Sequence, residues 1–382
     1  MQFSFTSEQE EFRSMLRRLL DEKSPPSVVR RLMETEAGFE RESWRELNRQ
    51  LGLTAIHIPE QYGGQGFGFV ELGIVLEEMG RALLCAPYFS STVLAATAIM
   101  NAGSEAQKRA LLPSIADGDT IATLAFTEPN GRWDTTGIEA TATRANGKFR
   151  LDGVKTFIPD GHTADLIVVL ARHPGSTGDA GLSFFTVPGD APGLARRALK
   201  VLDPTRKLAR IEFRSVEAEL LGDEGAAAGP LSKTLMQAAA CLANEMVGGA
   251  EKLRQSALDY ASLRVQFGRP IASFQTMKHK QADMLVDVEL ARSAAYRAAG
   301  AAADDDADLP AIASLAKACA SEAYLQTAIH TIQIHGGIGF TWDNDTHLWF
   351  KRAKSSEAFL GDASFHREQL MRAWDNETRE RA

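Results

Sequence analysis

The stretch Gln333-Ile-His-Gly-Gly-Ile-Gly-Phe-Thr-Trp342 closes a long helix-like run, and the rest of the chain is organised around it. The run extends from Ile312 to His335 and meets two adjacent glycines, Gly336 and Gly337, with a third glycine two residues later. Glycines in such a place either end a helix in a turn or let backbone N–H groups approach an anion or a flat ligand. The stretch alone leaves both interpretations open, so the remaining sequence has to decide between them.

Composition places the chain among globular proteins with a large core. It has 382 residues, of which 44% are hydrophobic and 24% charged, and this length suits two or three domains. Lysine and arginine total 42 against 50 aspartates and glutamates, a net charge of −8 that argues against a nucleic-acid-binding surface. We expect no membrane span, because no uncharged run is long enough, and no signal peptide, because segment 1–11 lacks a basic-then-apolar plan.

The cysteines and histidines predict neither disulfides nor a metal site. Cys85, Cys241 and Cys319 are scattered among alanines and leucines, which is typical of buried thiols in a reducing compartment. We therefore expect the protein to work in the cytoplasm. His330 and His335 are five residues apart and no acid completes a site at ligand spacing, so we expect no bound metal.

Residues 1–120 predict an N-terminal helical domain. Ser7, with Glu10 three positions later, has the spacing of a capping box in front of an apolar run. Trp44 and Leu47 begin another apolar repeat at helical spacing. We expect several amphipathic helices before residue 120.

Residues 121–228 predict a central β domain. The runs rich in β-forming residues follow one another with no helix-like segment between them. Strands at such spacing favour an antiparallel sheet or a small barrel. The runs are Ile121–Phe126, Asp165–Ala171, Leu182–Val187 and Ala209–Phe213.

Residues 229–382 predict a C-terminal helical bundle. Apolar residues keep one face from Leu231 to Ala257, over about seven helical turns. Long helices joined by short turns are typical of an up-down bundle. The other helices are expected at about Ser273–Ala302, Leu309–His335 and Phe365–Trp374. The whole chain is therefore predicted to be an α+β protein of three domains.

Five motifs in this order resemble those of the acyl-CoA dehydrogenases, and they span nearly the whole chain at the spacing of that family. Each motif alone is weak, but together and in order they are specific. The resemblance implies an N-terminal helical domain, a central β-barrel-like domain and a C-terminal four-helix bundle, with FAD between them. The motifs are Pro59-Glu-Gln-Tyr-Gly-Gly64, Thr127-Glu128-Pro129, Lys155-Thr-Phe157-Ile158, Arg264-Val-Gln-Phe267-Gly268 with Phe274-Gln275, and Gln333 to Gly339.

The resemblance also implies a reaction and a set of cofactor contacts. Family members remove the α-hydrogen of an acyl-CoA thioester as a proton and the β-hydrogen as a hydride to the flavin, and pass the electrons to an electron-transfer flavoprotein. By this resemblance Thr127 and Phe157 face the flavin. Arg264 and the Gly336-Gly337 pair reach across a subunit interface to the pyrophosphate of the neighbour's FAD. The other cofactor-binding residues implied by the motifs are Phe267, Gln275 and Gln333.

The sequence departs from the family at the catalytic base. In most members the base is a glutamate just before a glycine near the C-terminus, and that position here is Leu360, which cannot take a proton. Other members carry the glutamate on the first long helix of the bundle, at a position that is Ala238 here. The remaining candidates are Asp362, two residues beyond the usual place, and Glu245, about 10 Å further along the helix than Ala238.

Three further departures lie around the chain's own flavin position. Arg132-Trp133 stands where the family has a small Gly-Ser at the pyrophosphate. Pro159 replaces a threonine that offers the flavin edge an N–H and a hydroxyl, and proline offers neither. Asp362 puts an anion near the expected phosphates, where a buried unpaired charge is unfavourable. Together with the lost base, these changes predict that this half-site does not bind its own flavin.

Three hypotheses remain open at this point. In the first, the chain is the subunit of a heterotetramer, two copies each of two chains, that lends FAD-binding residues to a base-carrying partner, as in enzymes acting on steroid side-chain thioesters. In the second, it is a self-sufficient homotetramer that uses Asp362 or Glu245 as its base. In the third, it is a scaffold or acyl-CoA-binding protein that needs no FAD.

Overall fold

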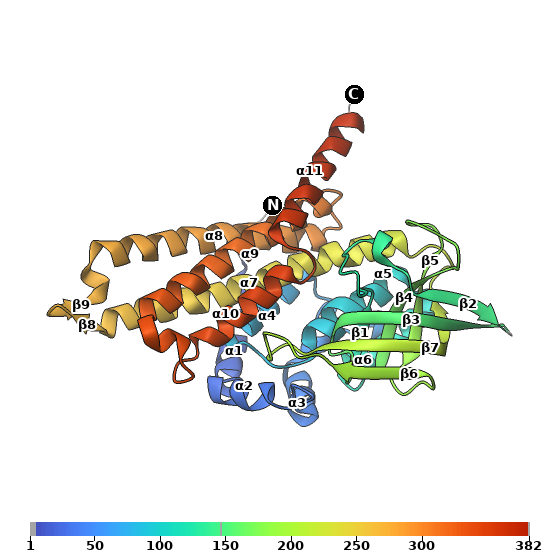
Figure 1. Ribbon diagram of the computed structural model, residues 1–382, viewed down its shortest axis with the longest axis horizontal. Helices are drawn as coiled ribbons and strands as arrows, with labels where there is room; N and C mark the ends of the chain where they lie inside the picture. The colour runs from blue at the N-terminus through green and yellow to red at the C-terminus, as the bar shows by residue number, and fades with distance from the viewer. Residues whose placement is uncertain (1–4, 146, 381–382) are drawn as a thin grey trace. The chain divides into compact units, whose positions relative to one another are not determined.

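The computed structural model describes residues 5–145 and 147–380 and contains two compact units (Figure 1). One unit is mainly helical and comprises residues 1–31, 69–84 and 236–382. The other contains the strands and comprises residues 32–68 and 85–235. Helices α2 (Pro26–Met33) and α7 (Ala228–Leu263) have residues in both ranges.

The β unit is a barrel. Its sheet runs in the order β1-β4-β2-β3-β7-β5, an additional β4–β5 pairing closes the ring, and β6 pairs with β7. Phe149 and Phe185 meet inside it with ring centroids 5.0 Å apart, among buried aliphatic side chains. The strands are β1 (Ala122–Ala125), β2 (Thr141–Ala145), β3 (Lys148–Pro159), β4 (Leu166–Arg172), β5 (Leu182–Pro188), β6 (Leu194–Ala198) and β7 (Leu208–Leu221).

The predicted β domain is confirmed, with one difference in strand direction. Most pairings are antiparallel, but β4 runs parallel to both β1 and β2. The β2–β3 hairpin lies between β1 and β4 in the chain, so that β4 runs in the same direction as β1. Helices α3 (Arg41–Leu51), α5 (Thr97–Ala102) and α6 (Glu105–Ala116) belong to the same unit, and Trp44 and Leu47 of α3 are buried as their spacing predicts.

The helical unit contains the predicted bundle. Helix α9 has the predicted bounds, α8 begins two residues later than predicted, and none of the described helices has the length and apolar character needed to cross a membrane. The sequence patterns did not predict α10, and the range predicted for α11 was too short at both ends. The helices are α1 (Ser7–Lys23), α4 (Phe69–Ala82), α7, α8 (Gln275–Ala303), α9 (Leu309–His335), α10 (Thr346–Ala358) and α11 (Ala363–Glu380).

The capping box of α1 lies one residue earlier than predicted. The N-cap is Thr6, whose hydroxyl accepts from the backbone N–H of Gln9 while the Gln9 side chain accepts from the N–H of Thr6. Ser7 and Glu10 have the same spacing as Thr6 and Gln9, so spacing alone could not separate the two pairs.

Glycines bring α4 and α7 close together. A Cβ atom at Gly248 of α7 would lie 1.8 Å from the backbone oxygen of Glu77 in α4, and one at Gly80 of α4 would lie 2.0 Å from that of Glu245 in α7. No side chain larger than hydrogen fits at either point without moving a helix.

Replacing Gly248 with alanine is therefore expected to lower the free energy of unfolding by about 3 kcal/mol, because the two backbones must separate. Gly300 of α8 is the matched control, since a Cβ there would meet nothing within 4 Å. Gly300→Ala should instead stabilise the helix by about 1 kcal/mol. Urea unfolding of the two variants measures the difference, and equal effects would contradict the close approach of α4 and α7.

Candidate cofactor-binding site

A short hairpin follows the end of α7 and carries the Arg264 motif (Figure 1). Its strands, β8 (Val265–Gln266) and β9 (Arg269–Pro270), are joined through Phe267 and Gly268, which have φ values of 52° and 77°. The backbone oxygen of Arg264 accepts from the N–H of Ile271 at 2.8 Å, which closes the base of the hairpin. This hydrogen bond fixes the backbone of Arg264 at the point where the hairpin begins.

The side chains of this hairpin face outward. Phe267 is 92% exposed and meets Phe274 edge to face, with centroids 6.1 Å apart. Arg264 is exposed, and its guanidinium forms no ion pair with any residue in the described ranges. Gln275 is exposed at the first position of α8. The hairpin and the start of α8 thus expose an aromatic ring, a guanidinium and an amide, and no ion pair holds the guanidinium within the described ranges.

The glycines after α9 lie at the same end of the bundle. Gly336, with φ 66°, caps α9, so the stretch does end a helix as one interpretation predicted. Just before it, His335 is buried and stacks on Tyr260 of α7 with centroids 4.4 Å apart. Gln333 is exposed and accepts from the Lys280 ammonium at 2.9 Å. A small apolar cluster packs beneath these contacts and includes Ala257, Ala261, Met284 and Ile334.

The residues at this end fit a dinucleotide pyrophosphate. A Cβ at Gly336 or Gly337 would meet nothing within 4 Å, so space for a ligand remains above this backbone. Both glycines are exposed, and Arg264 is the unpaired guanidinium that phosphate oxygens require. The structure thus brings together six of the eight predicted cofactor residues: Arg264, Phe267, Gln275, Gln333, Gly336 and Gly337.

The other two predicted residues, Thr127 and Phe157, lie together in the β unit. The Thr127 hydroxyl donates to the backbone oxygen of Thr156 at 2.6 Å, and the Thr156 N–H donates to the backbone oxygen of Thr127 at 3.0 Å. Phe157 is 44% exposed and has a φ of 59°, which is unfavourable for an aromatic residue and tends to mark functional sites.

A buried ion pair holds the same two segments together. The Lys155 ammonium donates to the Glu128 carboxylate at 2.7 Å, and both side chains are almost fully buried. Glu128 also accepts from the backbone N–H groups of Glu139 and Ala140. Burial lowers the pKa of Lys155 to about 8, against the opposing effect of Glu128.

Arg132, Trp133 and Pro159, the departures from the family pattern in this half-site, lie in the β unit near Thr127 and Phe157. The Thr127 hydroxyl has its proton committed to Thr156, and Pro159 is buried with no N–H to give. Trp133 packs against Phe126 with centroids 5.9 Å apart, which fills this region with a large ring. Arg132 is exposed and donates to the Thr136 hydroxyl.

The four positions considered for the catalytic base lie in the helical unit. Leu360 is 5% exposed and Ala238 is fully buried, and neither can accept a proton. Glu245 is buried and paired with the Arg352 guanidinium at 2.9 Å. Asp362 is exposed, and its carboxylate accepts from the N–H of Phe365 at 2.7 Å, which caps the start of α11. Both carboxylates therefore make structural contacts, an ion pair for Glu245 and a helix cap for Asp362.

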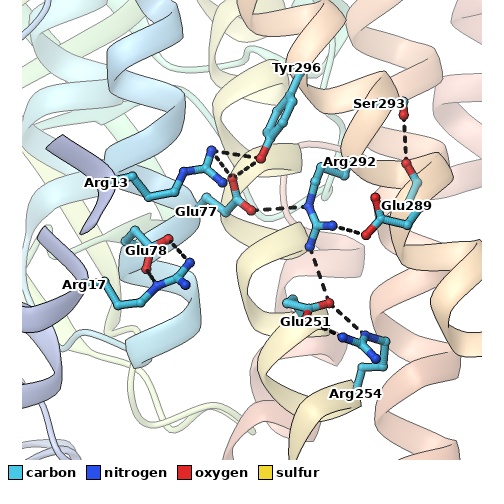
Figure 2. Close-up of polar contacts among 10 residues, drawn as sticks. All are labelled: Arg13, Arg17, Glu77, Glu78, Glu251, Arg254, Glu289, Arg292, Ser293 and Tyr296. Carbon is cyan, nitrogen blue, oxygen red and sulfur yellow. Dashed lines mark hydrogen bonds and ion pairs between the residues drawn. The ribbon is translucent and has the colours of Figure 1, made fainter. Parts of the chain in front are cut away.

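Sequence reasoning missed a network of charges inside the helical unit (Figure 2). Glu77 of α4 lies 3.1 Å from Arg13 and 3.5 Å from Arg292, and it accepts from the Tyr296 hydroxyl at 2.7 Å. Arg292 also reaches Glu251 of α7, so the network joins α1, α4, α7 and α8. Burial and the neighbouring Glu77 raise the pKa of Tyr296, which keeps its hydroxyl a donor.

Comparison with known proteins identifies the family that has this architecture. The chain matches three family models, described as the N-terminal domain (residues 6–119), the middle domain (123–216) and the C-terminal domain (230–374) of acyl-CoA dehydrogenase. It is 32% identical to the acyl-CoA dehydrogenase IpdE2 of Mycobacterium tuberculosis over 92% of this chain and 93% of that protein.

Solved structures agree with these matches. A steroid acyl-CoA dehydrogenase variant, Tcur3481-Tcur3483, is 30% identical with a TM-score of 0.87, over 97% of this chain and 98% of that one. The ChsE4-ChsE5 complex from Mycobacterium tuberculosis is 28% identical with a TM-score of 0.87, over 98% and 99% of the two chains. The chain therefore belongs to the acyl-CoA dehydrogenases, the FAD-dependent oxidoreductases that act on CH–CH bonds.

Proposed function

We propose that this chain is the subunit of a heteromeric acyl-CoA dehydrogenase that lends FAD-binding residues to a base-carrying partner. The observation that carries the proposal is a contrast within the molecule. Arg264 and the Gly336-Gly337 pair are exposed and unobstructed, whereas the base position holds the buried Leu360. When bound, FAD supplies the hydride acceptor of the family's reaction.

The surface beside the hairpin supports a protein partner. Leu263 is 81% exposed and Val265 is 53% exposed, next to Phe267 at 92%. Large apolar side chains in such a group are typical of protein interfaces. Three large apolar side chains of α8 are also exposed, namely Leu285, Val286 and Leu290 at 43%, 56% and 64%.

The names of the relatives support a proposal for the substrate class. One similar structure is named a steroid acyl-CoA dehydrogenase, and another is a complex of two differently named chains. We propose by analogy an acyl-CoA with a bulky, steroid-like acyl group and an electron-transfer flavoprotein as electron acceptor. We also propose domain boundaries near residues 120 and 228, and a cytoplasmic location for the protein.

The test is flavin content and turnover with and without a partner. The chain alone is expected to purify with little FAD and no activity. Co-expressed with an acyl-CoA dehydrogenase chain that carries a glutamate at the position equivalent to Leu360 or Ala238, it should form a yellow, active complex. A steroid side-chain CoA thioester should be oxidised faster than butyryl-CoA.

Two other outcomes would replace the proposal. Full FAD occupancy and turnover by the lone chain would favour a homo-oligomeric enzyme, and loss of that activity in Asp362→Asn or Glu245→Gln would identify its base. Binding of acyl-CoA without flavin reduction in any pairing would favour a scaffold protein.

A further inference from the structure

The connection between α10 and α11 has a strained backbone at the base position. Leu360 has a φ of 62° and Gly361 a φ of 99°. The left-handed region is unfavourable for a leucine because its Cβ approaches the backbone, and only glycine adopts it freely. At Gly361 a Cβ would lie 2.4 Å from the ring of Phe365. Something else in the structure therefore has to hold residue 360 in this conformation.

Lys317 of α9 contacts this connection from inside the unit. Its side chain is fully buried, and its ammonium donates to the backbone oxygen of Gly361 at 2.9 Å and to that of Glu357 at 3.2 Å. The third proton goes to the Ser321 hydroxyl at 2.9 Å. Burial lowers the pKa of Lys317 to about 7, and Glu357 and Asp362 oppose that shift. Burying a charged amine is unfavourable unless its hydrogen bonds are satisfied, and here it has three acceptors.

His366 holds the other side of the strained residue. It is fully buried, and its Nε2 lies 2.9 Å from the backbone oxygen of Leu360, so Nε2–H is the donor. Burial lowers the pKa of His366 to about 4, which keeps the ring neutral beside the Lys317 ammonium. The carbonyls of residues 360 and 361 are thus each held by a separate buried donor.

We propose that Lys317, together with His366, is a positioning residue that sets the backbone of residue 360. Capping the end of α10 explains the contact to Glu357, but the contacts to Leu360 and Gly361 lie beyond that helix. Position 360, where the family has its base, therefore has a fixed backbone conformation in this chain although the residue is a leucine. This inference rests on the proposed function only for the role assigned to position 360.

Hydrogen exchange of segment 355–368 in the purified chain tests the proposal. Lys317→Met removes all three hydrogen bonds and should speed exchange in this segment by about tenfold or more. In a Leu360→Gly background the same substitution should have an effect of about threefold or less, since glycine adopts the left-handed conformation without help. Leu360→Met should leave exchange unchanged.

Leu83→Gly is the matched control background. Leu83 is also buried with a positive φ, 52°, but it follows α4, and the three hydrogen bonds of Lys317 described above go to other residues. Lys317→Met should keep its full effect there. Equal effects of Lys317→Met in all three backgrounds would overturn the proposal, because Lys317 would then support only general stability. A change of exchange in Leu360→Met would also overturn it.

Ser321→Ala is the milder variant should Lys317→Met fail to fold. It removes one acceptor and should speed exchange of the segment by about threefold, again only where residue 360 is not glycine. An effect that persists in Leu360→Gly would contradict the proposal. Flavin content of the paired enzyme tests the proposed function separately, so either conclusion can fail without the other.

Discussion

Replacing Glu77 with alanine is expected to lower the free energy of unfolding of the chain by about 3–5 kcal/mol. Glu77 is buried, and its carboxylate is the shared partner of Arg13, Arg292 and the Tyr296 hydroxyl. Without it, two largely buried guanidiniums have no carboxylate at their centre, and an uncompensated buried charge is far more costly than an exposed one. Urea unfolding followed by circular dichroism measures the loss.

Glu289 gives the matched control, because it belongs to the same network but is 52% exposed (Figure 2). Glu289→Gln should change the free energy of unfolding by less than about 1 kcal/mol, as is typical of surface ion pairs. Glu77→Gln should lie between the two, since it keeps the volume and a hydrogen bond but loses the charge. If Glu77→Ala were as mild as Glu289→Gln, the network would not hold the four helices together.

Arg264→Gln should weaken FAD binding to the paired enzyme by about 10- to 100-fold. A charge-assisted hydrogen bond to phosphate contributes about 1.5–3 kcal/mol, which converts to that range. Arg264 has no ion pair in the described part of the chain, so its removal should leave the lone chain as stable as before. Flavin released on dilution, read by fluorescence, gives the affinity.

Arg372 of α11 provides the control for lost charge. It is an exposed arginine paired with Glu368 one turn away. Arg372→Gln should leave FAD affinity unchanged in the paired enzyme. The same loss of FAD in both variants would point to a general electrostatic effect, and no loss in Arg264→Gln would remove this residue from the cofactor site.

Local patterns predicted most of the fold. Helix α9 has its predicted bounds because apolar spacing and a terminal glycine pair mark both its face and its end. Helix α10 escaped prediction because it buries polar residues, among them His347 and Arg352, which hide an apolar face. The parallel pairing of β1 with β4 depends on the path of the chain between them, which no local pattern contains.

Family motifs in the sequence named six candidate cofactor residues that the structure places at one end of the bundle. Their role in binding FAD stays a prediction. The contacts of Lys317 with Gly361 and of Arg13 with Glu77 join residues 44 and 64 positions apart, so spacing gives no sign of them. Burial decides whether such charges matter, and burial is a property of the whole fold.

The exposed hairpin has a consequence for how the protein is supplied. A phenylalanine that is 92% exposed, beside two further exposed apolar side chains, is a surface on which unpartnered copies adhere to one another or to chaperones. Under the proposed pairing, the partner subunit would cover this surface, and copies of this chain made in excess would leave it exposed. If the proposed pairing holds, we expect balanced synthesis of the two chains and degradation of surplus copies.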